Sequence, residues 1–537
     1  MRRHGIDCIM TEHPDAHTPA AVTPMLMNGG DAVWRALPRR NTRKVSHLLA
    51  DDLRRQILSG QLAADQQLPP EAELTAGLQI SRETLREALR ILESQQLVEI
   101  RRGRGGGAVV RRPGLDAVAR YVALLLQLRK STLAHLEEVR TVVEPPAAEL
   151  LAAQAGFEDI ETLVELHDAE RAADGPLAFV TAMSAFDQAV IDLSGNRTLA
   201  VIAGVFRDIY AGQVYSSIGR TDSSSAEQIA RRVVVSHSAF LDAARRRDGS
   251  LAQNTWSDYL YTTNRMLFSR NISRQPIDMA PLWRAQAGRD SGESAPRRAS
   301  VVATEIRARI AEGQLGEGDR LPSLAGLATE FDISRPTLRE ALRILEMEFL
   351  LDLRTGDRSG ATIRTPTTRV ASQLAGIVLE ARGTTLADFY RALRLIEPSI
   401  MGLVASRIGA KQLNALKAVN TELAEYCDDT GRFVTAYREA EMVAFSAVKN
   451  PALTVIAEIL HWVRVAIEPG VTADVKGLPG VTRTNRRAQK LFAQFVDAAA
   501  EHDSPRATAV WSEALKANAP WAEESEVSRR LMLDLKG

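Results

Sequence analysis

The feature that most constrains this chain is a long internal repeat. Residues 81–93 read Ser-Arg-Glu-Thr-Leu-Arg-Glu-Ala-Leu-Arg-Ile-Leu-Glu, and residues 334–346 repeat them with one change, Glu83 to Pro336. The same separation relates two further pairs of segments, Gly60-Gln61-Leu62 with Gly313-Gln314-Leu315 and Leu68-Pro69 with Leu321-Pro322. Solenoid repeats are only roughly 20–50 residues long. The long period therefore indicates a tandem duplication of a complete two-domain unit.

The composition is that of a helical protein with several domains. The 537 residues allow four domains, a small one and a larger one in each half. Lysine plus arginine (67) equals aspartate plus glutamate (67), so any basic surface must be local. Cys8 and Cys427 form neither a disulfide framework nor a metal motif and are expected to be reduced thiols in a cytoplasmic protein. No apolar run approaches the ~18 residues of a bilayer span, and the best candidate, Val122 to Leu128, predicts a buried helix.

Each half begins with a pattern typical of a winged helix-turn-helix. Apolar residues at helical spacing run from Val45 to Gly60, and a short helix with Leu74 and Leu78 follows. Ser81 is a candidate N-cap for a third helix from Arg82 to Ser94. Two short apolar strands around a glycine-rich tip then predict a hairpin. We expect winged domains over residues 43–113 and 299–366.

The third helix predicts a DNA reader. Leu85, Ala88, Leu89 and Leu92 share one helix face and should pack on the core of the domain. Arg82, Arg86 and Arg90 form a row on another face, which recurs as Arg335, Arg339 and Arg343. A helix fits the major groove, where an arginine can donate two hydrogen bonds to guanine. The residues predicted to contact DNA are Ser81, Arg82, Thr84, Arg86, Arg102, Gly103, Arg104, Ser334, Arg335, Thr337, Arg339 and Gly356.

A structural interpretation of the same residues stays open. Glutamates alternate with the arginines, and ion pairs on a solvated helix would give a similar composition, with Arg90 and Arg343 the candidates for pairing. The first hairpin tip is either a wing that contacts phosphate or the minor groove, or a flexible connection. In the second tip Thr355 and Asp357 replace Arg102 and Arg104. We call the winged domains 43–113 and 299–366 the first and second heads. The replacements predict that the second head binds the DNA backbone less strongly than the first.

Long helical segments follow each winged domain. Residues 114–283 and 367–530 show helical periodicity without strand alternation. Residues 284–298 are rich in glycine, serine and proline and are expected to form a linker. Residues 1–42 lack sustained periodicity and the apolar core of a signal peptide, so we expect a disordered extension. The predicted fold class is mainly α: two winged helix-turn-helix domains, each followed by an all-helical domain.

These residues resemble the GntR family of bacterial transcription regulators. The resemblance rests, in both halves, on Leu-Pro, then Ser-Arg-x-Thr-Leu-Arg-Glu-Ala-Leu-Arg-x-Leu-Glu, then a glycine-rich wing. The helical segments look like the effector domain of the FadR-like (FCD) branch. The supporting residues are Arg140, Glu144, Phe186, Asn196, His237 and Asp248, with Glu397, Asn450 and Phe495 in the second half. The second half agrees less well, so its effector domain is expected to be degenerate.

Both heads depart from the family pattern at one place. The family's Leu-Pro-Ser-Glu-Arg becomes Leu68-Pro69-Pro70-Glu71-Ala72 in the first half and Leu321-Pro322-Ser323-Leu324-Ala325 in the second. The arginine that helps to hold DNA in the family is therefore missing from both heads.

The resemblance also bears on ligands. Many effector domains of this branch bind a metal through an aspartate and three histidines. The equivalent places hold Met183, Asp187, His237 and Tyr259 in the first half, and Tyr437, Glu441, Phe492 and Ala514 in the second. A divalent ion needs several convergent ligands, so we predict no metal and no cofactor. His237 is expected to be a pocket or core histidine.

A small carboxylate effector is what the resemblance implies. Arg140, Asp187 and His237 are then its candidate contacts in the first helical domain. The alternative for Arg140 is an internal salt bridge with Glu137 or Glu144.

The resemblance implies a DNA-binding transcription regulator, not an enzyme, acting in the cytoplasm on a double-stranded operator. Regulators of this branch act as homodimers on short palindromes. The duplication thus predicts either a single-chain pseudo-dimer with two heads or a homodimer of chains with four heads, and no membrane contact. A constitutive DNA binder, a protein-interaction scaffold and a regulator fused to an enzyme stay open. The last lacks support, because no phosphate-cradling loop or catalytic triad is found.

Overall fold

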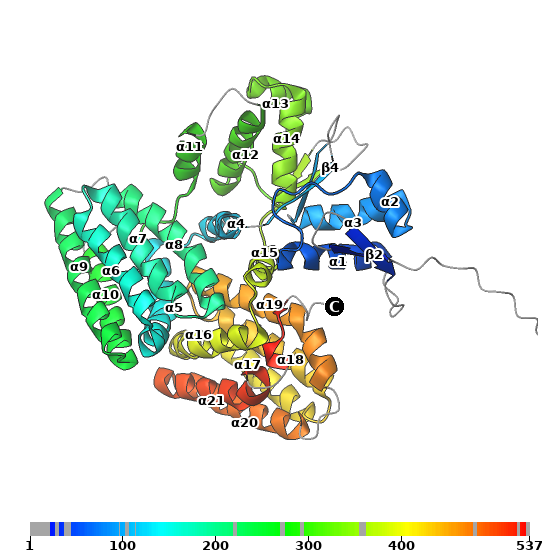
Figure 1. Cartoon of the computed structure of the whole chain (residues 1–537). Helices are drawn as coiled ribbons and strands as arrows, with labels where there is room; N and C mark the ends of the chain where they lie inside the picture. Colours follow the sequence, from blue (N-terminus) through cyan, green and yellow to red (C-terminus); the bar gives the residue numbers. More distant parts are fainter. Residues whose placement is uncertain are drawn as a thin grey trace, which may run out of the picture. The chain divides into compact units, whose positions relative to one another are not determined.

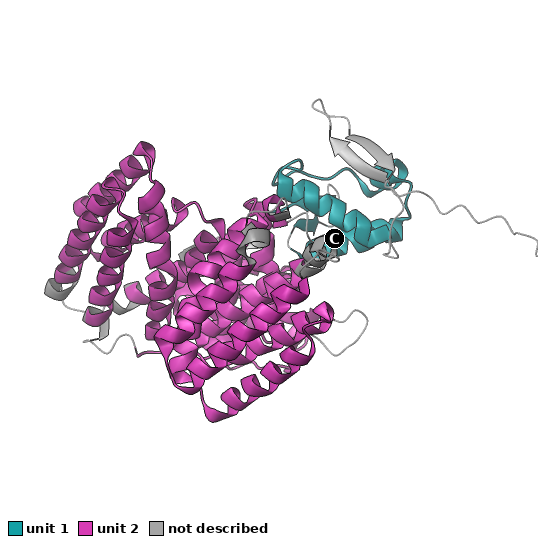
Figure 2. Cartoon of the chain, turned by 90° about the horizontal axis from the view of Figure 1, so that it is seen from below, with its two compact units in different colours: residues 1–112 teal, residues 113–537 magenta. Residues whose placement is uncertain are grey.

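The chain forms two compact units, Met1–Arg112 and Pro113–Gly537 (Figure 2). The computed structural model describes residues 22–26, 32–36, 45–95, 97–101, 107–112, 114–218, 223–268, 274–289, 295–353, 361–475, 481–523 and 527–532. Helices dominate both units, as predicted (Figure 1). Across these residues no helix is both long enough and apolar enough to span a membrane.

The first unit contains a winged helix-turn-helix. Its helices are α1 (Val45–Ser59), α2 (Glu71–Leu78) and α3 (Arg82–Ser94), and its hairpin pairs β3 (Val98–Arg101) antiparallel with β4 (Gly107–Val110). The chain leaves α1 at Gly60, whose φ of +86° lies in the left-handed region that favours glycine. The predicted order of helices and hairpin is confirmed.

The extension before this domain differs from expectation. Within residues 1–42, which we expected to be disordered, β1 (Val22–Leu26) pairs antiparallel with β2 (Ala32–Ala36). The other residues of this extension lie outside the described part.

The two helical domains repeat the same order of helices. The first contains α4 (Leu115–Leu128), α5 (Leu133–Gln154), α6 (Phe157–Ala172), α7 (Pro176–Asp192), α8 (Arg197–Ile218), α9 (Ser223–Arg245) and α10 (Gly249–Phe268). The second contains α15 (Thr368–Ala381), α16 (Leu386–Arg407), α17 (Ala410–Glu425), α18 (Thr430–Ser446), α19 (Pro451–Val475), α20 (Val481–Ala500) and α21 (Ser504–Glu523), followed by the short helix η1 (Val527–Arg529). The duplication is thus visible in the fold.

The second winged domain lies between the two helical domains in the chain. It contains α12 (Ala295–Ala311), α13 (Leu324–Glu330), α14 (Arg335–Met347), and the hairpin of β5 (Leu351–Leu353) with β6 (Ala361–Ile363). Its third helix is again capped by serine, and Pro336 sits in the first turn, where a missing N–H is tolerated.

The expected linker, 284–298, includes helical segments. It overlaps the end of α11 (Ala280–Arg289) and the start of α12. Arg284 of α11 pairs with Glu305 of α12 at 2.8 Å and also with Glu312. The guanidinium of Arg307 lies 5.9 Å from the ring centre of Trp283. These contacts dock α11 on the second winged domain, which the local glycine and proline content did not indicate.

The two helical domains pack on each other through equivalent helices. Contacts join α4 with α15 and α5 with α16, and the cross-contacts are reciprocal, α5 with α19 and α16 with α8. Buried apolar side chains of α4, α5 and α8 belong to one continuous core with those of the second helical domain. Such self-complementarity is the property of a twofold dimer interface.

Two asparagines show this internal symmetry at atomic detail. Asn196 and Asn450 stand at the start of the equivalent helices α8 and α19, and each side-chain oxygen accepts from an N–H of its own first turn. The Nδ2 of Asn196 donates to the carbonyl of Asp388 at 3.2 Å, and that of Asn450 donates to the carbonyl of His135 at 3.1 Å. His135 and Asp388 occupy the same position in α5 and α16. The two domains therefore contact each other as copies in a dimer would.

Neighbouring glutamates on α5 have opposite roles. Glu138 accepts from Arg407 at 3.0 Å and from Asn450 at 2.8 Å across the interface. Burial opposes its charge, but these donors hold the pKa of Glu138 below its ordinary value. Glu137 is 1% exposed, and its carboxyl oxygens have no hydrogen-bond partner among the described residues. Burial raises the pKa of Glu137 to about 8, only partly offset by Arg140.

We predict opposite effects of Glu137→Gln and Glu138→Gln. The unfolded chain releases the proton of Glu137 near pH 4.5 and the folded chain near pH 8, so the free energy of unfolding falls as pH rises between them. Glu137→Gln removes that fall and should stabilise the protein at pH 9 by roughly 2–4 kcal/mol. Glu138→Gln should destabilise it at pH 7 by roughly 1–3 kcal/mol, because Arg407 loses its charged partner and an NH₂ group replaces one accepting oxygen.

Urea unfolding of each variant and the parent at pH 5, 7 and 9 measures both effects. The advantage of Glu137→Gln should shrink at pH 5. Equal destabilisation by both substitutions at pH 9 would contradict the assignment.

Candidate functional site

The third helix of each winged domain, α3 and α14, has the two faces that its spacing predicted. In α3 the side chains of Leu85, Ala88, Leu89 and Leu92 are buried, whereas Arg82, Arg86 and Arg90 are exposed. In α14 the equivalent apolar residues Leu338, Ala341, Leu342 and Leu345 are buried, Arg335 and Arg339 are exposed, and Arg343 is half-buried. Burial of one face fixes the direction in which the arginines point.

Serine and threonine fix the start of each reading helix. The Oγ of Ser81 accepts from the N–H of Thr84 at 3.0 Å and lies 2.8 Å from the Thr84 hydroxyl. Ser334 and Thr337 repeat the arrangement at 3.3 Å and 2.8 Å. The four hydroxyls therefore cap and position the N-termini of α3 and α14. In helix-turn-helix proteins this end of the third helix is the part presented to DNA. Contact of these hydroxyls with DNA stays a prediction.

The two heads differ in the partner of one arginine. Arg86 pairs with Glu71 of α2 at 3.1 Å, and both side chains are exposed. The second head has Leu324 at the place of Glu71, and leucine cannot pair with Arg339. Any other contact of the Arg86 guanidinium has to compete with Glu71, whereas Arg339 meets no acid at that place. The predicted wing residues Arg102, Gly103, Arg104 and Gly356 lie outside the described residues.

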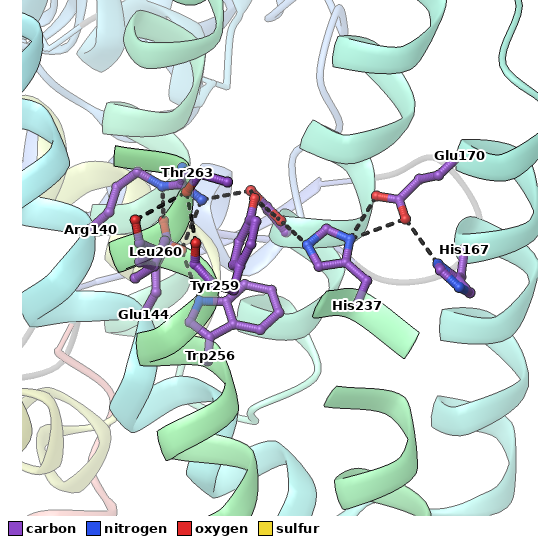
Figure 3. Close-up of polar contacts among 10 residues, drawn as sticks. Arg140, Glu144, His167, Glu170, His237, Trp256, Tyr259, Leu260 and Thr263 are labelled. Atoms are coloured by element: carbon purple, nitrogen blue, oxygen red, sulfur yellow. Dashed lines mark hydrogen bonds and ion pairs between the residues drawn. The ribbon is translucent and has the colours of Figure 1, made fainter. Parts of the chain in front are cut away.

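A buried polar network occupies the first helical domain (Figure 3). Arg140 of α5 donates to Glu144 at 2.6 Å and to Asp187 of α7 at 2.7 Å. Trp256 of α10 donates to Glu144 at 3.0 Å, and the Tyr259 hydroxyl donates to Asp187 at 3.1 Å. The three predicted effector contacts, Arg140, Asp187 and His237, are brought together. The internal salt bridge with Glu144, one of the alternatives for Arg140, is present.

His237 links this network to α6. Its Nδ1 lies 2.8 Å from Glu170, and Glu170 also lies 3.0 Å from Nδ1 of His167. The other nitrogen, Nε2, lies 3.3 Å from Asp187 without the alignment of a hydrogen bond. The imidazole is flanked by the rings of Phe186 and Trp256, whose centres are 4.3 Å and 5.6 Å away.

The charged groups of this network shift one another's pKa values. Burial opposes ionisation of His237, but the carboxylates of Asp187 and Glu170 raise its pKa to about 9. Burial alone would raise the pKa of Asp187, whereas Arg140 and His237 hold it below its ordinary value. Burial and the neighbouring Asp187 raise the pKa of Glu144 in spite of Arg140. Two buried cations, Arg140 and His237, therefore lie against the three buried carboxylates of this site, Glu144, Asp187 and Glu170.

The metal position implied by the family does not suit a divalent ion here. Of its four places, Met183 offers a thioether and Tyr259 a phenol whose pKa burial raises well above its ordinary value. Asp187 is already bound to the Arg140 guanidinium, whose charge repels a cation. A different group, His167, Glu170 and His237, has donor atoms within 4.8 Å of one another, but each already contacts another member of the group.

A cavity of about 320 Å³ adjoins the network. Its walls come from α5, α7, α8, α9 and α10. Arg140 and Tyr259 both line it and contact the buried carboxylates Glu144 and Asp187. Most other lining side chains are apolar, among them Phe179, Val180, Ile229 and Val233. The first helical domain can thus enclose a small molecule next to a charged core.

The second helical domain builds a similar network from other residues. Trp511 donates to Glu397 at 3.3 Å, as Trp256 does to Glu144. Arg464 of α19 donates to Glu441 at 2.6 Å and lies 3.6 Å from Glu397. By position in the repeat, Arg464 replaces Tyr210, and Leu393 replaces Arg140. The guanidinium has moved from α5 to α19 but still joins the two equivalent carboxylates.

A second guanidinium strengthens this network. Arg438 donates to Glu441 at 2.8 Å. Burial opposes the charge of Glu441, yet Arg438 and Arg464 lower its pKa to about 2. Phe492 takes the place of His237. The four family ligand positions of the second domain hold Tyr437, Glu441, Phe492 and Ala514, and Glu441 is paired with two arginines.

Comparison with known proteins decides the family. The profile described as "Bacterial regulatory proteins, gntR family" matches residues 46–107 and 298–361. The FCD domain profile matches residues 135–262 and 388–517. The chain belongs to the GntR family. It carries two GntR winged domains and two FCD domains in tandem, so it is a transcription regulator with effector-type domains.

Named relatives agree with this assignment. An uncharacterized HTH-type transcriptional regulator of Mycobacterium tuberculosis is 30% identical over 183 residues, 34% of this chain and 75% of the relative. The HTH-type transcriptional repressor NanR of Cronobacter sakazakii is 26% identical over 259 residues, 46% of this chain and 96% of the relative. Among solved structures, a Streptococcus agalactiae GntR is 19% identical, covers 41% of this chain and 98% of its own, and has a TM-score of 0.31.

Several residues of the FCD site were missed from the sequence. Glu170 and His167 were not singled out, although Glu170 contacts Nδ1 of His237 and His167 contacts Glu170. Arg464 was missed because it replaces a tyrosine on a different helix from Arg140. A usable signal was the spacing His167-x-x-Glu170, which places both side chains on one face of a helix. It does not reveal the partner on α9.

We predict that the guanidinium of the first FCD domain can be moved as it is in the second. Arg140→Leu should destabilise the domain by roughly 3–5 kcal/mol, because Glu144 and Asp187 lose a buried counter-ion. Arg140→Leu with Tyr210→Arg reproduces the arrangement of Leu393 and Arg464 and should recover a large part of that loss. Thermal unfolding of the three proteins measures this. A double variant no more stable than Arg140→Leu would contradict the equivalence.

Proposed function

We propose that this GntR-family regulator acts as a single-chain pseudo-dimer whose two heads read the two halves of one operator. The observation that carries the proposal is the symmetric pairing of the FCD domains, with Asn196 and Asn450 making the same hydrogen bond in opposite directions. A homodimer interface has this reciprocity between two chains. Here one chain satisfies it, so no second chain is required.

Each head carries its own arginine row. Arg82 and Arg86 on α3, and Arg335 and Arg339 on α14, are exposed above buried leucine faces. The heads differ at Glu71 and Leu324 and in their wing sequences, which favours an operator with two unlike half-sites. Electrostatic contact to phosphate positions such a helix, and arginine contacts with base edges specify the sequence.

A small-molecule effector in the first FCD domain completes the proposal. The cavity lies beside Arg140, whose helix α5 contacts α16 and α19 of the partner domain. A ligand with unequal affinity for two arrangements of this interface would shift the population of the binding-competent form. The protein would act in the cytoplasm and would not be an enzyme.

The second candidate is a homodimer of chains with four heads on a longer operator. It follows from the usual assembly of this branch, whose regulators act as homodimers of two chains. The remaining candidates are a constitutive DNA binder, a protein-interaction scaffold and a regulator-enzyme fusion. No observation on the described residues favours any of these over the single-chain arrangement.

We predict that the free protein and its operator complex each contain one chain. Light scattering coupled to gel filtration should give a mass near 58.7 kDa for the free protein, and one chain per duplex for the complex. Two chains per duplex at saturating protein would contradict the proposal and support the four-head arrangement.

We predict that both arginine rows contribute to operator binding. Arg82→Ala with Arg86→Ala, and Arg335→Ala with Arg339→Ala, should each weaken binding by roughly 1–3 kcal/mol per lost base contact. Electrophoretic mobility shift with genomic fragments retained by the parent measures this. Arg245→Ala, an exposed arginine paired with Asp242 on the first FCD domain, is the control and should change little. Full retention by the protein lacking all four arginines would favour the scaffold.

A further inference from the structure

The cavity of the first FCD domain has an unusual balance of charge for a site expected to take a carboxylate. Its lining contains one basic residue, Arg140, and two acidic ones, Asp174 and Glu227. Asp174 and Glu227 are exposed. Among the described residues that line the cavity, none is a lysine or a histidine. The approach to the cavity is therefore acidic, not basic.

The guanidinium of Arg140 is already paired with carboxylates of the protein. Its Nε and Nη2 donate to Glu144 at 2.6 Å and 3.1 Å, and Nη2 also donates to Asp187 at 2.7 Å. The guanidinium carbon lies 4.7 Å from the ring centre of Tyr210 and 5.8 Å from that of Tyr259. Two internal carboxylates thus already pair with Arg140, the basic side chain among the described residues of the wall. A further buried carboxylate would lack a counter-ion, which is costly.

Three hydroxyl groups line the described wall, those of Tyr210, Tyr259 and Thr263, and two of them already donate their proton within the protein. Tyr259 spends its one O–H on Asp187 at 3.1 Å. Thr263 spends its own on backbone carbonyls, at 2.9 Å to Tyr259 and 3.1 Å to Leu260. A hydroxyl whose proton is used still offers its oxygen as an acceptor. The wall therefore suits a ligand that donates hydrogen bonds, whereas a carboxylate only accepts them.

The size and remaining lining indicate the body of the ligand. An engineered apolar cavity of about 150 Å³ holds one benzene molecule. The present volume of about 320 Å³ leaves room for a ring with a short chain. Phe179, Val180, Met183, Val214, Ile229 and Val233 provide an apolar enclosure for it.

We infer that the first FCD domain binds a small, mainly apolar molecule with a neutral or cationic hydrogen-bond donor as head group, an alcohol or an amine, in place of a carboxylate. This inference rests on the proposed role of this cavity as the effector site. It replaces the carboxylate class that the family resemblance implied. The acceptors of Tyr259 and Thr263 select the donor, and the acidic approach favours a positive charge.

Three probes that differ only in the head group test the inference on the full chain. They are 3-phenylpropan-1-ol, 3-phenylpropylamine, which is an ammonium at pH 7, and 3-phenylpropanoate. Calorimetric titration and thermal shift should show that the alcohol and the ammonium bind at least tenfold more tightly than the carboxylate. Tightest binding by 3-phenylpropanoate, or binding by none of the probes, would overturn the inference.

Variants locate the binding. Ala230→Phe places a ring in the cavity and should abolish binding of every probe, with circular dichroism and thermal unfolding confirming that the domain is folded. Asp174→Asn should weaken the ammonium several-fold relative to the alcohol. Asp428→Asn, at the equivalent place in the second FCD domain, is the matched control and should leave both unchanged. Unchanged binding to Ala230→Phe would place the probes elsewhere and overturn the inference.

The same preparations separate this inference from the proposed function. Retention of genomic DNA fragments is measured without probes. If retention is lost while the order of the probes holds, the DNA-reading proposal fails and the ligand class stands. If retention is normal and the carboxylate binds best, the ligand class fails and the regulator stands.

Discussion

The pairing of the two FCD domains is the interaction on which the rest of the structure depends. It joins α4, α5 and α8 to α15, α16 and α19 through one apolar core, and polar contacts at Glu138 and Asp388 fix its register. The interface couples the two copies within one chain. A dimer of separate chains forms such contacts only at sufficient concentration, whereas here they are independent of concentration. Because both winged domains belong to one chain, each molecule always carries one copy of each.

Duplication has allowed the two FCD domains to diverge. In the first, Arg140 joins two buried carboxylates and His237 supplies a second positive charge. In the second, Arg464 and Arg438 do so from other helices. Buried carboxylates need a counter-ion, but the position from which it comes is free to change. One domain keeps a cavity beside its network, and the other has Tyr437, Glu441, Phe492 and Ala514 at the family ligand positions.

Local patterns predicted much of the fold. The bounds Arg82–Ser94, the Ser81 cap and the exposed arginine row follow from helical spacing and cap chemistry, which operate within a few residues. Contacts between separate helices did not follow from these local patterns. They are the Arg86–Glu71 pair, the contact of His237 with Glu170 and the docking of α11 through Arg284. Their partners depend on packing angles that periodicity does not contain. The transfer of the guanidinium from α5 to α19 is hidden for the same reason.

The central claim is that both heads of one chain hold one operator. It is tested most directly by comparing the affinity of the protein for a duplex with both half-sites and for duplexes with either half-site alone. Linkage makes the second contact intramolecular and should strengthen binding by roughly 10²–10⁴-fold. The account predicts at least about a hundredfold tighter binding to the complete operator, with one chain per duplex. Equal affinity for the complete operator and a single half-site would contradict it.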